Sequence, residues 1–410
     1  MNDRLDIRRE HVVAGGPDDF MEVRHLVLGG SNRAIGRHLA ELARDRLGCR
    51  KEPWTDPAAT RAQKAFLEEH WPGHRERARG VADVYGIAAD DQGRDSSFLY
   101  YQWAVPGCSV AFYPPPTVSG GRAILARNYD FSTGGATELL RGTPLAGEAP
   151  ATSRPFILEL HPDVGYSTLT LCTYELLGGA TDGINSEGLS VALLADAETL
   201  SGAYRPLRTS GVGISEIQTV RWLLETCRNA DEARAALART PQFYIDVPCH
   251  YMVADSSGDS FVWELGFTDH PRLIEGDASR VSTVTNHLLY DHDRIAEHVE
   301  ESVGRRATLE CAIEDNGPLH QLSDIEAASR RVAATAPAGV GQYAGASLAR
   351  TLWHAFYDLT KCELVIDFYL GDDPATKLIK RSSQRRFAFG EAPGIGAAPP
   401  LSGAAATSPL

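Results

Sequence analysis

The chain has 410 residues, of which 43% are hydrophobic and 23% charged, a composition that excludes fibrous, disordered and disulfide-rich classes. Its formal net charge of -14 argues against a nucleic-acid partner, because phosphate binding requires clustered lysine and arginine, and these residues are scattered here. No apolar run approaches the roughly 18 residues of a membrane helix, and the first residues lack the apolar core of a signal peptide. We therefore expect a cytoplasmic protein that contacts neither membrane nor nucleic acid and acts on a small molecule.

The first hundred residues are predicted to be mainly helical after a polar start. Residues 20–30 read as a strand, and residues 31–48 as a helix capped by Ser31 or Asn32 and ended by Gly48. Further helical patterns occupy residues 56–86 and the stretch around 96–105. The glycine turn "GGSNRAIGR" lacks the Gly-Lys-Ser/Thr ending of a P-loop, so we interpret it as a structural turn.

From Cys108 onward the periodicity changes to short alternating strands. Two helices interrupt them within residues 215–240, the second beginning near Asp231. Strands followed by helices and again by strands favour an α+β sandwich in which helices cover antiparallel sheets. The last twenty residues, rich in proline, glycine, alanine and serine, are predicted to lack fixed structure. The predicted strands are 122–132, 156–162, 166–176 and 189–196, with hairpins in 249–266 and 351–371.

The seven cysteines contain no C-x-x-C pair, which favours reduced thiols over a metal or redox motif. His287, His292 and His298 have separations that match neither one helical face nor a known zinc pattern. We therefore expect no metal and no cofactor. Cys172 lies on an apolar pattern and reads as a small buried hydrophobe, whereas Cys108 has different surroundings.

Cys108 follows Val105, Pro106 and Gly107, a combination that predicts a tight, irregular turn. A peptide bond in such a turn is open to attack by the neighbouring thiol. The Gly107 carbonyl would move from nitrogen to sulfur, and hydrolysis of the thioester would free the Cys108 amine. Because an α-amine has a pKa of about 8 and a thiol of about 8.5, that amine can take the thiol proton. Taken as a dipeptide, however, Gly-Cys favours an ordinary buried cysteine.

Polar residues at the ends of predicted strands strengthen the hydrolytic interpretation. Arg127 and Asp130 lie in "ARNYDFS", Asn185 in "DGINSEGLSVAL", Asn286 in "STVTNH" and Arg350 in "GASLARTLWHAFYD". Each of them is unremarkable alone. Together, they provide a nucleophile, cations, a carboxylate and neutral donors in one chain.

In this order the motifs resemble the acyl-coenzyme A:6-aminopenicillanic acid acyltransferase-like family, relatives of the choloylglycine hydrolases among the N-terminal-nucleophile hydrolases. The resemblance runs from "VRHLVLGGSNRAIGRHLAE" through Gly107-Cys108, "ARNYDFS" and "TNH" to "RTLWHAFYDLTKCEL". It implies a four-layer αββα fold and self-cleavage before Cys108. The cleaved N-terminal segment, residues 1–107, would stay bound to the catalytic chain, residues 108–390, ahead of a disordered tail, 391–410.

The resemblance also implies roles for the site residues. Cys108 would be the nucleophile, Asp130 would orient its amine, and Arg127 would favour the thiolate. Asn185 and Asn286 would hold the oxyanion or the amine. Arg350 would match the late family arginine that supports the nucleophile.

These residues predict a hydrolase of linear, non-peptide amides that works through a Cys108 thioester. Acyl transfer from coenzyme A or an amide to an amine is the alternative, and an uncleaved, non-catalytic homologue is a second alternative. A Cys-His hydrolase that uses His287 is a third possibility. The expected partners are the small amide or acyl substrate, the chain's own N-terminal fragment and further copies in a homo-oligomer.

Overall fold

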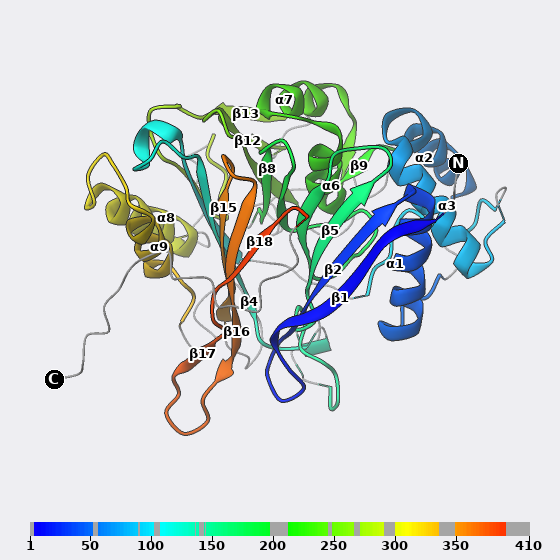
Figure 1. Cartoon of the computed structure of the whole chain (residues 1–410), viewed down its shortest axis with the longest axis horizontal. Coiled ribbons are helices and arrows are strands. Elements are labelled where there is room, and N and C mark those ends of the chain that lie inside the picture. Colours follow the sequence, from blue (N-terminus) through cyan, green and yellow to red (C-terminus); the bar gives the residue numbers. More distant parts are fainter. Residues whose placement is uncertain are drawn as a thin grey trace.

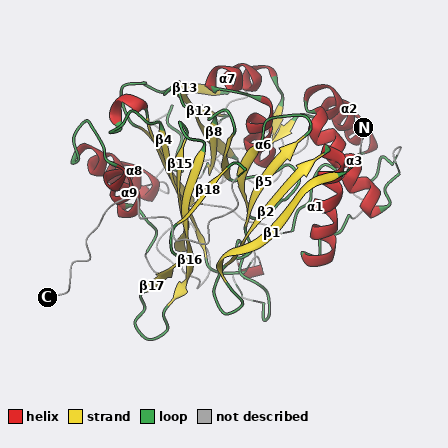
Figure 2. Cartoon of the chain, viewed as in Figure 1, coloured by secondary structure: helices red, strands yellow, loops and turns green. Residues whose placement is uncertain are grey.

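A computed structural model describes residues 4–51, 56–88, 91–101, 107–135, 137–138, 143, 145–196, 212–244, 248–265, 271–290, 300–335 and 349–390. Two sheets lie face to face between two helical layers (Figure 1). Figure 2 shows the same order, with strands at the centre and helices on both outer sides. The predicted four-layer αββα architecture is therefore confirmed.

The N-terminal segment contributes both strands and helices. Its first helix begins after Ser31, whose hydroxyl accepts the Ala34 amide as an N-cap (3.2 Å), and it packs against α3. A glycine at position 86, with φ of 62°, ends α3 in the left-handed conformation. The elements are β1 (Leu5–Gly15), β2 (Glu22–Gly30), α1 (Asn32–Arg46), α2 (Pro57–His70) and α3 (Pro72–Tyr85).

The first sheet has nine strands within the described residues, in the order β1-β2-β5-β6-β7-β8-β11-β12-β13. Only the β2–β5 pair among them is parallel, and it joins the N-terminal segment to the rest of the sheet. Helices α1 and α6 pack on this sheet. The further elements are β5 (Phe156–Pro162), β6 (Thr168–Cys172), β7 (Asp182–Asn185), β8 (Ser190–Ala195), α6 (Glu216–Thr226), α7 (Ala230–Arg239), β11 (Cys249–Ala254), β12 (Ser260–Glu264) and β13 (Arg272–Glu275).

The second sheet runs β14-β3-β4-β15-β16-β17 in the described residues, with β18 also paired to β16. Helices α8 and α9 cover its outer face. Its elements are β3 (Gly107–Tyr113), β4 (Ile124–Ser132), β14 (Ser282–Val284), α8 (Glu300–Glu314), α9 (Leu322–Arg331), β15 (Ala349–Asp358), β16 (Glu363–Asp372), β17 (Ile379–Arg381) and β18 (Arg385–Ala388). A 3-10 turn, η1 (Pro115–Thr117), follows β3, and β9 (Ile214–Ser215) pairs with β10 (Gln242–Phe243).

The main apolar core joins residues of both sheets with residues of the helices that pack on the first sheet, such as Leu39 and Leu223. Strands β3 and β4 are buried at every position, as expected for strands covered on both faces. A smaller apolar cluster, which includes Leu309, Ile313 and Ile325, packs α8 and α9 onto the second sheet. Cys108 on β3 is thus enclosed inside the sandwich.

Two sequence expectations for the N-terminal segment were wrong. Strand β1 was missed because it is an edge strand whose residues are largely polar and partly exposed. The expected helix around 96–105 is absent from residues 96–101, where the Tyr101 amide bonds to the Tyr174 carbonyl (2.9 Å) in an extended connection. Gly107 is the first residue of β3, while Val105 and Pro106 of the predicted turn, and the C-terminal tail, lie outside the described residues.

No helix within the described residues is long and apolar enough to cross a membrane.

Candidate active site

Cys108 is the second residue of β3 and is completely buried. In the strand register it lies opposite Tyr129 on β4, and Gly107 lies opposite Asp130. Strand β3 also contacts β8 of the other sheet. The Gly107–Cys108 peptide is therefore enclosed between the two sheets, at the start of a strand.

Arg127 contacts the nucleophile candidate directly. Its Nη2 lies 3.1 Å from the Cys108 Sγ, and its Nη1 donates to the Leu193 carbonyl (2.8 Å). Its Nε is 3.1 Å from Oδ1 of Asp182, a fully buried carboxylate that also accepts the hydroxyl of Tyr357 (2.7 Å). Asp182 compensates the buried charge of Arg127, which a lone guanidinium could not tolerate cheaply.

The Cys108 thiol is protonated near neutral pH in the uncut chain. Burial raises the pKa of Cys108 to about 12, although the positive charge of Arg127 acts in the opposite direction. Arg127 lowers the pKa of Cys108, as expected for a cation that favours the thiolate, but burial raises this pKa by more. A base must be supplied before the sulfur can act as a nucleophile.

Asp130 lies beside the peptide that precedes Cys108. Its carboxylate accepts a short hydrogen bond from the Thr351 hydroxyl, and its Oδ2 is 3.7 Å from Nη1 of Arg305. Burial raises the pKa of Asp130, because a charged carboxylate is disfavoured away from water. Since Arg305 also bonds to the Cys108 carbonyl, Asp130 is held close to the Cys108 backbone.

Asn286 recognises the backbone nitrogen of Cys108. The Cys108 amide donates to the Asn286 Oδ1 at 2.7 Å, while the Asn286 Nδ2 donates to the Ala195 carbonyl (2.8 Å). In this arrangement the side chain is an acceptor for the nitrogen rather than an oxyanion donor. Of the two roles expected for Asn286, the geometry favours the one toward the amine.

Arg305 was missed by the sequence analysis. It projects from α8 and donates from Nη2 to the Asn286 Oδ1 (3.1 Å), besides its bond to the Cys108 carbonyl. The same guanidinium is paired with Glu301 (2.9 Å), one helical turn earlier. In the sequence, this i,i+4 pair resembles an ordinary solvated helix face, so no local signal distinguished Arg305.

Asn185 and Arg350 do not join this group. Asn185 donates both amide hydrogens to the end of α6, at the Leu224 carbonyl (2.9 Å) and the Cys227 carbonyl (2.8 Å), so it stabilises a helix end and has no donor left for an oxyanion. Arg350 is paired with Asp372 (2.6 Å). The neighbour of Arg350, Thr351, is the residue that reaches Asp130.

His287 follows Asn286 but contacts other groups. Its Nδ1 lies 3.1 Å from the Thr285 hydroxyl and 3.0 Å from the Ser302 hydroxyl. His292 and His298, considered above as metal ligands, lie outside the described residues. Within the described part of the chain, no group of three or more histidine, cysteine or acidic side chains could hold a metal ion.

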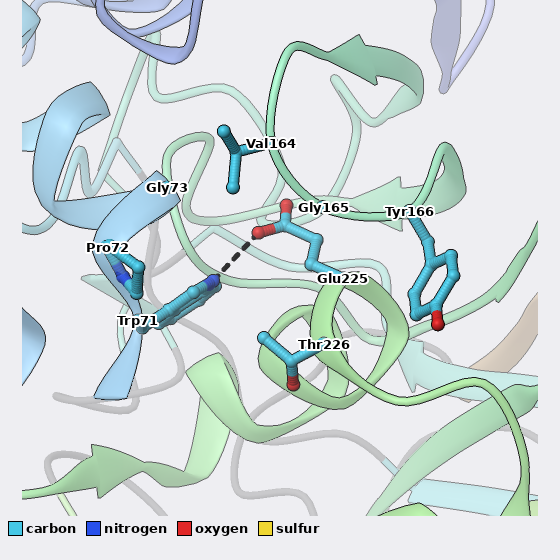
Figure 3. Close-up of a pocket in the computed structure, with 8 residues that line it drawn as sticks. All are labelled: Trp71, Pro72, Gly73, Val164, Gly165, Tyr166, Glu225 and Thr226. Atoms are coloured by element: carbon cyan, nitrogen blue, oxygen red, sulfur yellow. Dashed lines mark hydrogen bonds between the residues drawn. The ribbon is translucent and has the colours of Figure 1, made fainter. Parts of the chain in front are cut away.

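A cavity of about 420 Å³ lies elsewhere, on the helical side of the first sheet (Figure 3). Trp71 and Tyr166 lie on opposite sides of it. The Glu225 carboxylate accepts from the Trp71 indole (2.9 Å) and from Arg77 (2.7 Å), so both of its oxygens are satisfied internally. None of the expected site residues lines this cavity.

The chain is similar to a known family and, at low sequence identity, to several solved structures. No curated protein matches it. Conjugated bile acid hydrolase from Clostridium perfringens is 14% identical, with a TM-score of 0.44 over 67% of this chain and 92% of that one. Penicillin V acylase from Agrobacterium tumefaciens is 14% identical, with a TM-score of 0.38 over 69% and 80%.

A family model described as acyl-coenzyme A:6-aminopenicillanic acid acyl-transferase matches residues 118–372. The matched stretch begins after Cys108 and includes Arg127, Asp130, Asn286 and Arg305. Because this match covers more than half of the sequence, the chain belongs to the acyl-coenzyme A:6-aminopenicillanic acid acyl-transferase family.

Proposed function

We propose that the chain cuts itself between Gly107 and Cys108 and then hydrolyses a linear amide through a Cys108 thioester. The observation that carries the proposal is that the sulfur and the backbone nitrogen of Cys108 each contact a different polar side chain. Arg127 contacts the sulfur of Cys108, whereas Asn286 accepts from its backbone nitrogen. Any buried amide needs an acceptor, but here the acceptor is a side chain, because Cys108 lies beyond the last pair of the β14–β3 ladder.

Self-cleavage would begin with attack of the Cys108 sulfur on the Gly107 carbonyl carbon. A C–S bond forms, the C–N bond breaks, and the released Cys108 nitrogen takes up the thiol proton. Water then hydrolyses the thioester, which leaves a Gly107 carboxylate and a Cys108 with free thiol and amine. Asp130, which lies opposite Gly107, and Asn286, which accepts from the Cys108 amide, would hold that new amine.

Turnover would use the same amine as a base. It removes the thiol proton, so that the pKa of about 12 found for the uncut, buried thiol no longer limits attack. The sulfur then adds to the substrate carbonyl, the substrate amine leaves with the proton, and the acyl group remains on Cys108 as a thioester. Water completes hydrolysis, whereas an amine acceptor would complete acyl transfer.

Contacts between the segments support the expectation that residues 1–107 remain bound after the cut. Strand β2 pairs with β5 along its length, and the fully buried Arg77 donates to Glu225 on α6 at 2.7 Å. The Gln63 side chain exchanges hydrogen bonds with the Gly213 backbone (2.8 and 2.9 Å). We therefore treat residues 1–107 and 108–390 as two chains that share one core.

The intact mass of freshly purified protein under denaturing conditions tests the cleavage. We expect two fragments that meet between Gly107 and Cys108 and whose masses add up to the chain plus one water, and a single chain for Cys108→Ala. An uncut wild-type chain would leave Cys108 without a free amine and would contradict the mechanism.

A panel of acyl amides, assayed with and without 6-aminopenicillanic acid as acceptor, then separates hydrolysis from the acyl transfer named in the family description.

A further inference from the structure

The segment from Thr285 to Leu289 carries Asn286 but is not held by strand pairing. Strand β14 ends at Val284, and its ladder with β3 ends there too. Thr285, Asn286 and His287 are nevertheless completely buried. The position of the Asn286 side chain therefore depends on side-chain contacts made by the surrounding elements.

Two buried residues of the other sheet hold this segment at both ends. His250 on β11 lies directly opposite Glu264 on β12, with 3.0 Å between the His250 Nδ1 and the Glu264 Oε1, and both are fully buried. The His250 Nε2 donates to the Thr285 carbonyl at 2.7 Å. The Leu289 amide donates to the Glu264 carboxylate, at 2.9 and 3.2 Å. Asn286 lies between the two anchored positions.

The contacts of His250 place a proton on Nε2, because that nitrogen faces the Thr285 carbonyl, which cannot donate. The Nδ1 faces Glu264, which can only accept when it is ionised, so that Nδ1 then carries a proton as well. Burial favours the neutral ring, but the hydrogen bond and the charge of Glu264 outweigh it and raise the pKa of His250, with a further contribution from Asp196 after β8. With Glu264 ionised, the pair is thus a buried imidazolium and carboxylate. Their other hydrogen bonds go to the Thr285 carbonyl and the Leu289 amide, at the two ends of one backbone segment.

We propose that the His250–Glu264 pair is the positioning unit of the active site, because it holds residues 285–289 so that Asn286 receives the Cys108 nitrogen. This inference rests on the proposed function and adds to it two residues whose hydrogen bonds go to the backbone of Thr285 and Leu289 rather than to Cys108. Loss of either residue would displace Asn286 without removing it. A displacement of about 1 Å at a catalytic group can cost roughly a hundred-fold in rate.

Amide exchange tests the positioning without requiring any activity. In the uncut Cys108→Ala chain, the amide of residue 108 still faces Asn286, while the amides in the interior of β3 belong to the sheet. Glu264→Gln in this background is expected to speed exchange at residues 108 and 289 at least about ten-fold more than at Ala111. Equal changes at the three positions would overturn the proposal, because general destabilisation affects them alike.

A double-mutant cycle then tests the functional consequence. His250→Gln should slow self-cleavage about ten- to a hundred-fold, but should slow it little further in an Asn286→Ser background, because coupled residues are not additive. His354→Gln is the matched control, since His354 is also buried but bonds to Asn128 (2.7 Å). Its effect should multiply with that of Asn286→Ser. Equal factors for His250→Gln in both backgrounds, or a rate within about two-fold of wild type, would contradict the proposal.

The two experiments separate this inference from the proposed function. A wild-type chain that is never cut, together with selective exchange at residues 108 and 289, would reject self-cleavage and retain the positioning role. A chain that is cut normally, with no selective exchange at these residues, would reject the positioning role and retain self-cleavage. A 15N spectrum of the histidine rings provides an independent check, because His250 should be doubly protonated at pH 7 in the wild type and lose that state in Glu264→Gln.

Discussion

Two buried cysteine–arginine pairs in this protein have similar contacts and different surroundings. Arg127 approaches Cys108 to 3.1 Å, and Arg221 on α6 approaches Cys172 on β6 to 3.0 Å. Burial raises the pKa of both thiols, against the opposing charge of the neighbouring arginine. Judged by the thiol and the guanidinium alone, the two sites are alike.

The difference lies in the groups around each pair. Arg127 is compensated by Asp182, and the backbone nitrogen of Cys108 has its own partner in Asn286. Arg221 also donates to the Gly179 carbonyl (3.1 Å), but its Nε and Nη1 have no hydrogen-bond partner among the described residues. Under the proposed mechanism, a cation beside a cysteine is insufficient for a nucleophile, because a means of releasing and holding the amine is also required.

The largest contrast is expected from replacing each cysteine in turn. Cys108→Ser should lower amide turnover by roughly a thousand-fold or more, since it removes the thiolate on which the chemistry depends. Cys172→Ser should be cut and active at the wild-type level. Amide hydrolysis by the two purified variants, beside their intact masses, provides the measurement. Equal losses in both variants would mean that Cys172 shares the chemistry and that the contrast drawn here is wrong.

Replacing the arginine of each cysteine–arginine pair should lower the free energy of unfolding by different amounts. Arg127→Met leaves Asp182 as an uncompensated buried charge, so we expect a loss of about 3–5 kcal/mol in the free energy of unfolding. Arg221→Met removes a buried charge that has no carboxylate within ion-pair distance among the described residues and should cost less. Urea unfolding of both variants in the Cys108→Ala background measures this without interference from cleavage. A greater loss for Arg221→Met would show that the guanidinium has an anionic partner.

The pH dependence of alkylation should show how cleavage changes Cys108. The freshly refolded wild-type chain, sampled before it is cut, has a buried thiol whose pKa is raised to about 12, so its reaction with iodoacetamide should rise about ten-fold per pH unit from pH 7 to 10. In the cut chain the neighbouring amine assists, and the rate should level off near pH 8. Cys172 should react slowly in both chains. Peptide mapping of the labelled cysteines distinguishes these profiles, and identical profiles for Cys108 would indicate that the amine has no influence.

The smallest effect is expected from the threonines beside the two sites. Thr351→Val removes the hydrogen bond that holds the Asp130 carboxylate and should slow self-cleavage about ten-fold. Thr170→Val removes a hydroxyl 3.7 Å from the Cys172 sulfur and should leave cleavage unchanged. Time courses of fragment formation after refolding give both rates. A slower cut in Thr170→Val would show that the Cys172 region affects the nucleophile.

Helices and strands were predicted correctly where the order of polar and apolar residues along the sequence matched which residues are buried in the structure. The hairpin of β15 and β16 and the capped helix α1 are examples, because alternation and capping are properties of neighbouring residues. Residues 96–101 were mispredicted because the Leu99 amide donates to Glu175 and the Tyr101 amide to Tyr174. Such long-range partners override the local preference.

For the site, the sequence by itself was enough to single out the residues that stand in recognisable motifs. Cys108, Arg127 and Asp130 were proposed from the order of the motifs and the resemblance that they carry, and the β3–β4 register brings them together. Only the tertiary structure decided the rest. Arg305 enters from a helix 197 positions away, while Asn185 caps α6 and Arg350 pairs with Asp372. A polar residue at a strand end has the same local signature whether it faces the nucleophile or a helix end, and only the packing of the sheets and helices decides between them.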